Sequence, residues 1–220
     1  MIEYGANVKS IDFFRMNFSY SRKKTSTCYG AVLYNKDPLT SDNTLFIGSI
    51  IVPHPNMECL YIKISETHQV LKNPVLVLEG YSRNKFISLL EGFCCEGTPL
   101  PDFLNTPGSQ IQGITEFQKS VYEATCNIPH GETRPYTWLS TKVKKSGAER
   151  AVGRAMGSNP FPLLIPCHRV VKKDGSIGGF MGNDSSESWQ VQLKRSLLDL
   201  EESHRQPSLF SLNTGHNASL

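Results

Sequence analysis

The sequence predicts an α+β fold in two parts, a β-rich N-terminal domain and a helical C-terminal domain with helix-turn-helix character. Short β-branched and aromatic runs fill most of the first hundred positions, and apolar residues at helical spacing dominate positions 115–202. The segment "TPLPDFLNTPGSQIQG" between them has the composition of a connection. We expect domains at 1–105 and 115–202, a linker at 106–114 and a mobile polar tail at 203–220.

The N-terminal domain is expected to hold strands followed by one helix. Runs at 29–35, 44–52, 59–65 and 74–80 are β-branched or aromatic and are separated by polar or proline-containing turns. A short helix follows at 84–94, where four apolar residues recur at helical spacing: Phe86, Leu89, Leu90 and Phe93.

Helices dominate the C-terminal domain. "TEFQ", at 115–118, is a capping box that begins a helix, and "IPHGET" ends it. A second helix is expected at 137–143. "SGAE", at 146–149, is another capping-box match and begins a third helix, which stops at Pro160. A final helix at 189–202 has one apolar face, made by Trp189, Leu193, Ser196, Leu197 and Leu200.

The second and third of these helices predict a helix-turn-helix. They are short and closely spaced, and Arg150 and Arg154 share the outer face of the third helix with Gly153 and Gly157. The two glycines have no side chains, so this face of the helix can approach another surface closely. Two extended runs around a turn at 174–175 resemble the wing of a winged helix. Ordinary helix packing is the alternative.

Charge is concentrated near these helices. Between residues 134 and 173 there are nine Lys or Arg and one acid, so this stretch carries +8 in a chain whose net charge is +3. Such a patch favours a polyanionic partner such as nucleic acid, and a solvated lysine-rich surface is the alternative. No apolar run reaches about 18 residues, so we expect no membrane span. The start lacks the apolar core of a signal peptide, so we expect the protein inside the cell.

The six cysteines are irregularly spaced, which argues against a disulfide framework in an intracellular protein. Cys28, His54, Cys59 and His68 are too scattered for a zinc site, so we expect no metal. We also expect no cofactor.

"LLIPCHRVV" contains the one pair with clear chemical potential. A thiol is nucleophilic as the thiolate, and an imidazole can accept its proton. If the segment is extended, Cys167 and His168 point to opposite sides, so a water molecule would bridge them. A carboxylate would then orient the imidazole, and the final helix offers Asp199, Glu201 and Glu202. From the pattern alone, a purely structural pair remains the alternative.

"IPCHRVV", preceded by "RAVGRAMGSNPFPLL" and followed by "GSIGGF", resembles the signature of the O6-alkylguanine-DNA alkyltransferase family, which repairs DNA alkylated at guanine O6. The resemblance extends over residues 115–202. It implies a ribonuclease-H-like N-terminal α/β domain and a C-terminal winged helix-turn-helix domain that carries the active-site cysteine. Residues 1–105 contain no motif of the family.

The resemblance implies a role for each site residue. Cys167 accepts the alkyl group, His168 takes its proton through water, and Glu201 orients His168. Asn159 lies at the hinge before the active-site segment. Tyr136 helps to rotate the nucleotide and assists the leaving oxygen. Arg150 enters the duplex in place of the flipped base. The remaining DNA-binding residues are Ala151, Gly153, Arg154, Ala155, Arg134 and Thr137, and the base pocket comprises Pro162, Val170, Gly178, Phe180 and Met181.

The implied reaction is transfer of an alkyl group from O6-alkylguanine, and from O4-alkylthymine, to Cys167. Base flipping is required because O6 lies on the pairing edge of a stacked base. The thioether product resists hydrolysis, so each molecule acts once. We expect a monomer that binds duplex DNA, in the nucleus of a eukaryote or the cytoplasm of a prokaryote. The alternatives are a lesion-binding or alkylation-sensing protein and a thiol hydrolase. The loop at 183–192 is longer than the family pattern.

Overall fold

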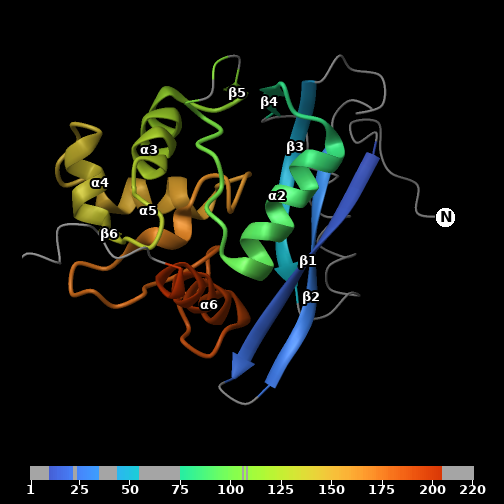
Figure 1. Cartoon of the computed structure of the whole chain (residues 1–220). Coiled ribbons are helices and arrows are strands. Elements are labelled where there is room, and N and C mark those ends of the chain that lie inside the picture. The colour runs from blue at the N-terminus through green and yellow to red at the C-terminus, as the bar shows by residue number, and fades with distance from the viewer. Residues whose placement is uncertain are drawn as a thin grey trace, which may run out of the picture.

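The computed structural model describes residues 10–21, 24–34, 44–54, 75–105, 107 and 109–204. Its N-terminal part is a five-stranded antiparallel sheet in the order β1-β2-β3-β4-β5 (Figure 1). The strands are β1 Ser10–Ser21, β2 Lys24–Tyr34, β3 Thr44–His54, β4 Val75–Glu79 and β5 Gln110–Gln112. Helix α2, Arg83–Glu96, packs against the sheet on the side of the C-terminal helices (Figure 1).

The C-terminal part is mainly helical. Its helices are α3 Glu116–Cys126, α4 Tyr136–Lys142, α5 Glu149–Gly157 and α6 Trp189–Ser203, and a 3-10 turn, η1, spans Cys167–Arg169. Two short strands, β6 Arg134–Pro135 and β7 Val170–Val171, pair in parallel. α4 and α5 pack together, and α3 packs on both. In the part of the chain that the structure describes, no helix is long and apolar enough to cross a bilayer.

The local sequence explains where the helices begin and end. The Ser82 hydroxyl caps the start of α2, and Gly97, at φ 68°, ends it in the left-handed conformation that glycine tolerates best. The predicted capping box of α3 is confirmed, because Thr115 and Gln118 each bind the other's backbone N–H. The apolar face of α2 is buried through Phe86, Leu90 and Phe93, so the spacing that predicted this helix also formed its core contacts.

The strands at 29–35, 44–52 and 74–80 are confirmed, whereas the run at 59–65 lies outside the described residues. β1 was not predicted. It alternates buried Phe14 and Met16 with exposed Phe13 and Arg15, and its polar positions concealed the strand in the sequence. Part of the expected linker is also ordered, because β5 pairs with β4.

Two local predictions for the C-terminal part are wrong. The second capping box does not form: Ala148 precedes α5 without a side-chain cap, and the Glu149 carboxylate accepts a hydrogen bond from Ser140 Oγ at 2.9 Å instead. The expected hairpin around 174–175 is only a turn, closed by the bond from Lys172 N to Ser176 O at 2.9 Å. β7 ends at Val171 and pairs in parallel with β6, and residues 172–188 form no second strand that would complete a hairpin.

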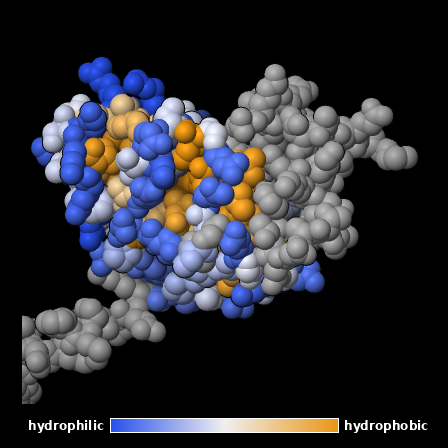
Figure 2. Space-filling view, turned by 90° about the horizontal axis from the view of Figure 1, so that it is seen from above, coloured by the Kyte–Doolittle hydropathy of each residue, from blue (hydrophilic) through white to orange (hydrophobic). Residues whose placement is uncertain are grey.

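The described surface is largely hydrophilic when viewed from above, and hydrophobic residues show between the hydrophilic ones (Figure 2). A groove between α3 and α4 contains Trp138, whose ring lies 5.3 Å from Lys142 Nζ and 5.9 Å from the Arg134 guanidinium carbon. These cation–π contacts hold two members of the basic patch on one aromatic side chain.

Candidate active site

A pocket of about 280 Å³ lies between α5, α4 and the loop that precedes α6, and Cys167 is one of its lining residues. The side of α5 that faces the pocket consists of Gly153, Met156 and Gly157. The absence of side chains at the two glycines leaves space beside the sulfur. Cys167 is only 6% exposed, so a reacting group must enter the pocket to reach it.

Cys167 and His168 lie in the 3-10 turn η1, not in the extended segment that the sequence suggested. Arg169 N donates to Pro166 O at 2.9 Å and Cys167 N to Ile165 O at 2.7 Å, which closes the backbone into a tight turn. The prediction of an extended segment is therefore wrong, because prolines on this stretch favour a turn instead.

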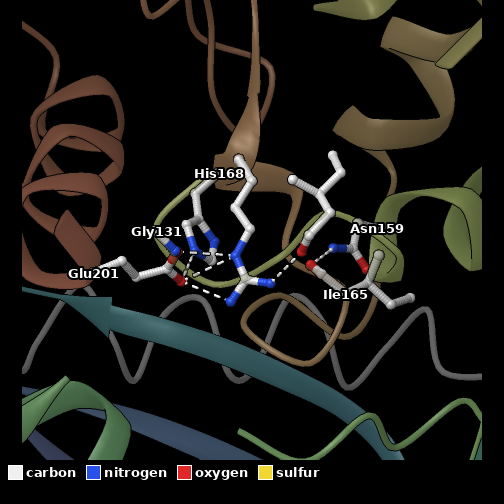
Figure 3. Close-up of polar contacts among 7 residues, drawn as sticks. Gly131, Asn159, Ile165, His168 and Glu201 are labelled. Carbon is white, nitrogen blue, oxygen red and sulfur yellow. Dashed lines mark hydrogen bonds and ion pairs between the residues drawn. The ribbon is translucent and has the colours of Figure 1, made fainter. Parts of the chain in front are cut away.

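Asn159 connects the end of α5 to the sulfur. Its Nδ2 donates to Ile165 O at 2.9 Å (Figure 3). The same Nδ2 donates to Cys167 Sγ at 3.2 Å, and Oδ1 accepts from Phe161 N at 3.0 Å. The Phe161 bond determines which end of the amide faces the sulfur, because a backbone N–H can only donate. Asn159 therefore presents a fixed donor to the sulfur.

His168 is completely buried and is held by Glu201 from α6. Its Nε2 lies 2.8 Å from Glu201 Oε1 (Figure 3). An ionised carboxylate can only accept, so Nε2 carries the hydrogen and Nδ1 is the free base. Nδ1 is buried and has no hydrogen-bond partner among the described residues. The imidazole thus keeps one unoccupied acceptor.

Arg169 also binds Glu201, which the sequence did not indicate. Its Nε donates to both carboxylate oxygens at 3.1 and 2.9 Å, Nη2 donates to Oε1 at 2.9 Å, and Nη1 donates to Ile128 O at 2.8 Å. Gly131 N adds a bond to Oε2 at 3.0 Å (Figure 3). Arg169 is 9% exposed, so it belongs to this network rather than to the basic surface patch.

The pKa shifts follow from this arrangement. Burial alone would raise the pKa of Glu201, but His168 and Arg169 outweigh it and hold that pKa well below its ordinary value. Burial lowers the pKa of His168 below its ordinary value, although Glu201 opposes this. His168 is therefore neutral at rest. Burial raises the pKa of the Cys167 thiol, and the Asn159 bond and Lys194 counteract the rise.

Lys194, on α6, is a second charged residue that no sequence pattern singled out. It is 0% exposed, and its Nζ donates to Val170 O at 2.6 Å and to Gly179 O at 3.2 Å. Burial lowers its pKa to about 8, and the nearby Cys167 partly offsets that effect. Lys194 thus ties β7 to the pocket loop. A lysine among leucines on a helix signals such a role only once its burial is known.

Tyr136 and the loop of Phe180 and Met181 form the walls of the pocket. Burial, and then the nearby Cys167, raise the pKa of Tyr136 above its ordinary value, so its hydroxyl stays protonated. Phe180 and Asn183 exchange backbone bonds of 2.7 and 3.0 Å around Met181 and Gly182, which have φ of 51° and 78°. These values are those of a tight two-residue turn, and it forms the rim of the pocket.

The structure brings together only some of the predicted base-pocket residues. Phe180 and Met181 line the cavity. The predicted Gly178 is not among the lining residues, but its neighbour Gly179 is. Pro162 and Val170 are buried outside its lining, although Val170 is tied to the site through Lys194. Asn183 and Asp184 also line it. They belong to the predicted loop at 183–192, whose course could not be derived from the sequence and whose last four residues form the first turn of α6.

The predicted DNA-binding residues are also divided. Arg150 and Arg154 are exposed on α5, and Ala151 is half-buried. Ala155 is 4% exposed, and its expected place on the DNA-facing surface is wrong, because it packs into the core beneath α5. The two remaining residues, Arg134 and Thr137, are half-buried near the start of α4, and Arg134 pairs with Glu132 at 2.6 Å.

No cluster of three or more potential metal ligands occurs among the residues that the structure describes. Cys59 and His68 lie outside those residues. The expectation that the protein binds no zinc therefore stays a prediction.

Residues 116–203, which contain this whole network, match the family model described as the DNA-binding domain of 6-O-methylguanine DNA methyltransferase. Over these residues the chain is similar to that methyltransferase family. Over 88 residues it is 42% identical to the inducible methylated-DNA–protein-cysteine methyltransferase of Bacillus subtilis, covering 40% of this chain and 45% of that protein. Over 90 residues it is 43% identical to the methyltransferase of Methanosarcina barkeri, covering 41% and 52%. The chain matches about half the length of these curated relatives.

Two solved methyltransferases share the fold beyond the matched domain. The O6-methylguanine-DNA methyltransferase of Pyrococcus kodakaraensis has a TM-score of 0.57 at 23% identity and covers 86% of this chain and 99% of that one. The O6-methylguanine methyltransferase of Mycobacterium tuberculosis has a TM-score of 0.52 at 23% identity and covers 92% and 99%. At this identity the likeness shows the fold alone. It extends that fold to the N-terminal half of the chain.

Proposed function

We propose that this protein repairs DNA by direct reversal, transferring the alkyl group of O6-alkylguanine to Cys167 once per molecule. One observation carries the proposal: a donor from Asn159 lies 3.2 Å from the sulfur in a pocket, and the neighbouring His168 offers a free buried acceptor nitrogen. Nucleophile, base and orienting carboxylate are thus assembled beside a space for a substrate.

The proton moves first. Cys167 gives its proton, through a bridging water molecule, to His168 Nδ1, the unoccupied nitrogen. The Nε2–H bond to Glu201, at 2.8 Å, orients the ring and stabilises the positive charge that then develops. Because burial lowers the pKa of His168, the base is neutral and ready when the substrate arrives. The Asn159 donor stabilises the thiolate.

The thiolate then attacks the alkyl carbon in line with the bond to guanine O6. The carbon–sulfur bond forms, the carbon–oxygen bond breaks, and its electron pair goes to the departing guanine. The protonated Tyr136 hydroxyl, in the pocket wall, donates a hydrogen bond or proton as the oxygen leaves. The thioether is not hydrolysed, so the protein is consumed stoichiometrically.

Duplex DNA is the proposed partner, and α4 with α5 is the proposed helix-turn-helix. The exposed Arg150 would replace the flipped base, and Arg154 would bind phosphate, because both extend from the face of α5 that carries Gly153 and Gly157. The N-terminal sheet is proposed to be ribonuclease-H-like. We further propose that O4-alkylthymine is also accepted and that the protein acts as a monomer wherever DNA is held, in a nucleus or a prokaryotic cytoplasm.

Intact-mass measurement tests this function. The protein is incubated with duplex DNA containing one O6-methylguanine, and we expect a gain of one methyl group per molecule, mapped to Cys167, with unmodified guanine restored in equal amount. Cys167→Ala should bind the same DNA and gain no mass. Lesion binding by the wild type without an adduct would instead indicate a lesion-binding protein, and multiple turnovers per molecule would contradict the stoichiometric mechanism.

A further inference from the structure

The N-terminal sheet contacts the active-site hinge at one carbonyl group. β4 pairs with β3 along Thr44–Ile47. Further along β3, Ile50 N donates to Pro160 O at 3.0 Å, and Ser49 Oγ donates to the same oxygen at 3.1 Å. Ser49 is 7% exposed, so little water competes for this bond. The sheet therefore holds Pro160 by two donors at once.

The same peptide unit continues toward the sulfur. The carbonyl of Pro160 and the N–H of Phe161 belong to one planar peptide group. That N–H donates to Asn159 Oδ1 at 3.0 Å, and Asn159 Nδ2 donates to Cys167 Sγ at 3.2 Å. Four groups thus form one unbroken chain of hydrogen bonds: the Ser49 hydroxyl, the Pro160–Phe161 peptide, the Asn159 amide and the Cys167 sulfur.

We propose that Ser49 is a positioning residue for the alkyl-transfer reaction, acting on the acceptor sulfur of Cys167 through this chain of hydrogen bonds. The proposal rests on the proposed function. Each donation polarises the next group: a peptide whose carbonyl accepts two bonds is a stronger donor at its N–H, and an amide whose oxygen accepts that N–H is a stronger donor at Nδ2.

The chain also has a geometric effect. Asn159 precedes a proline, so its own backbone conformations are already restricted. Fixing the Pro160 carbonyl on β3 then fixes the plane of the next peptide, and with it the direction of the N–H that holds the Asn159 side chain. A small rotation of that peptide would move the amide away from a sulfur 3.2 Å distant. Ser49 thereby gives the N-terminal sheet a defined part in the chemistry.

Ser49→Ala tests the proposal, with Ser49→Thr as the variant that keeps the hydroxyl. One neutral hydrogen bond corresponds to about a two- to tenfold effect. We expect Ser49→Ala to slow single-turnover methyl transfer by that factor and to shift the pH profile of Cys167 alkylation by iodoacetamide upward. That profile is followed on the Cys167 peptide by mass spectrometry, since other cysteines also react. DNA affinity should not change, and Ser49→Thr should recover most of the rate.

Two controls separate positioning from loss of stability. Ile47→Val lies on the same strand, is 0% exposed in the wild type and does not bind Pro160, so it should leave the profile unchanged. In an Asn159→Ala background, Ser49→Ala should have no further effect, because the chain is already broken. An unchanged rate and profile in Ser49→Ala, equal slowing in Ile47→Val, or full additivity with Asn159→Ala would each overturn the proposal.

The two hypotheses fail differently. If the wild-type protein transfers no methyl group from DNA, the proposed function is wrong, and the iodoacetamide profiles still decide whether Ser49 controls the thiol. If transfer occurs normally and Ser49→Ala matches the wild type in both assays, the function stands and the positioning role is wrong.

Discussion

Replacing Arg169 by methionine isolates the contribution of the buried guanidinium. In the wild type it donates three bonds to Glu201 and one to Ile128 O. Arg169→Met keeps much of the side-chain length and leaves the Glu201 carboxylate, 0% exposed, without its cation. Removing one partner of a buried ion pair costs about 3–5 kcal/mol. Since His168 can become protonated and neutralise part of the charge, we expect Arg169→Met to lower the free energy of unfolding by about 3 kcal/mol at neutral pH.

The way this loss of stability depends on pH follows from the pKa of Glu201. The pKa of Glu201 is depressed in the folded protein, so its contribution to stability is present above the ordinary carboxyl pKa and is lost as the pH falls through the depressed value. Arg169→Met weakens that depression. The loss of stability should therefore be largest at neutral pH and should shrink on acidification.

Urea denaturation measures both effects, and Arg150→Met is the matched control. It removes the same charge from an exposed position, and a surface change of this kind should stay within about 0.5 kcal/mol. Glu201→Gln added to Arg169→Met should restore part of the stability, because no buried charge then remains. A loss below about 1 kcal/mol in Arg169→Met, or a loss equal to that of Arg150→Met, would refute the assignment of Arg169 as the neutralising cation of Glu201.

Three further predictions concern the pocket and α5. Lys194 has a folded-state pKa of about 8, so above that pH the unfolded chain binds more protons than the folded chain. The stability of the wild type relative to Lys194→Met should therefore rise by up to about 3 kcal/mol toward pH 10, as measured in urea titrations. A stability difference that does not change with pH would contradict the burial of the Lys194 charge. Tyr136→Phe should slow transfer by about 100-fold in single-turnover assays without weakening DNA binding, and an unchanged rate would exclude the hydroxyl as the donor. Arg150→Ala should slow transfer from duplex DNA far more than from free O6-benzylguanine, and equal slowing would contradict the role of Arg150 in flipping.

The sequence predicted most elements because their signals are local. The capping box at Thr115 and the apolar spacing of α2 and α6 depend on neighbours within one or two turns. β1 and β5 escaped prediction because their strand character depends on pairing with distant segments. The second capping box failed for the same reason, since the Glu149 carboxylate has a nonlocal partner in Ser140.

The candidate site shows the same division. The resemblance of "IPCHRVV" led to Cys167 and His168, and Glu201 was selected with them. The charged residues that complete the network could not be found this way. Arg169 was counted with the surface charges, and Lys194 was ignored, because only the folded chain reveals that both are buried. Ser49 lies 111 positions from the carbonyl that it binds, so no local pattern could have paired them.

The position of Arg169 bears on the proposed role of His168 as a base. A buried carboxylate paired with His168 alone would favour the imidazolium, which has no free nitrogen to accept a proton. Burial is the largest influence and lowers the pKa of His168, Glu201 opposes it, and the charge of Arg169 adds to the lowering. The carboxylate can still orient the ring through Nε2 and leave Nδ1 open. In the proposed mechanism, Glu201 orients His168, and Arg169, directly after the Cys-His pair, helps to keep that imidazole neutral.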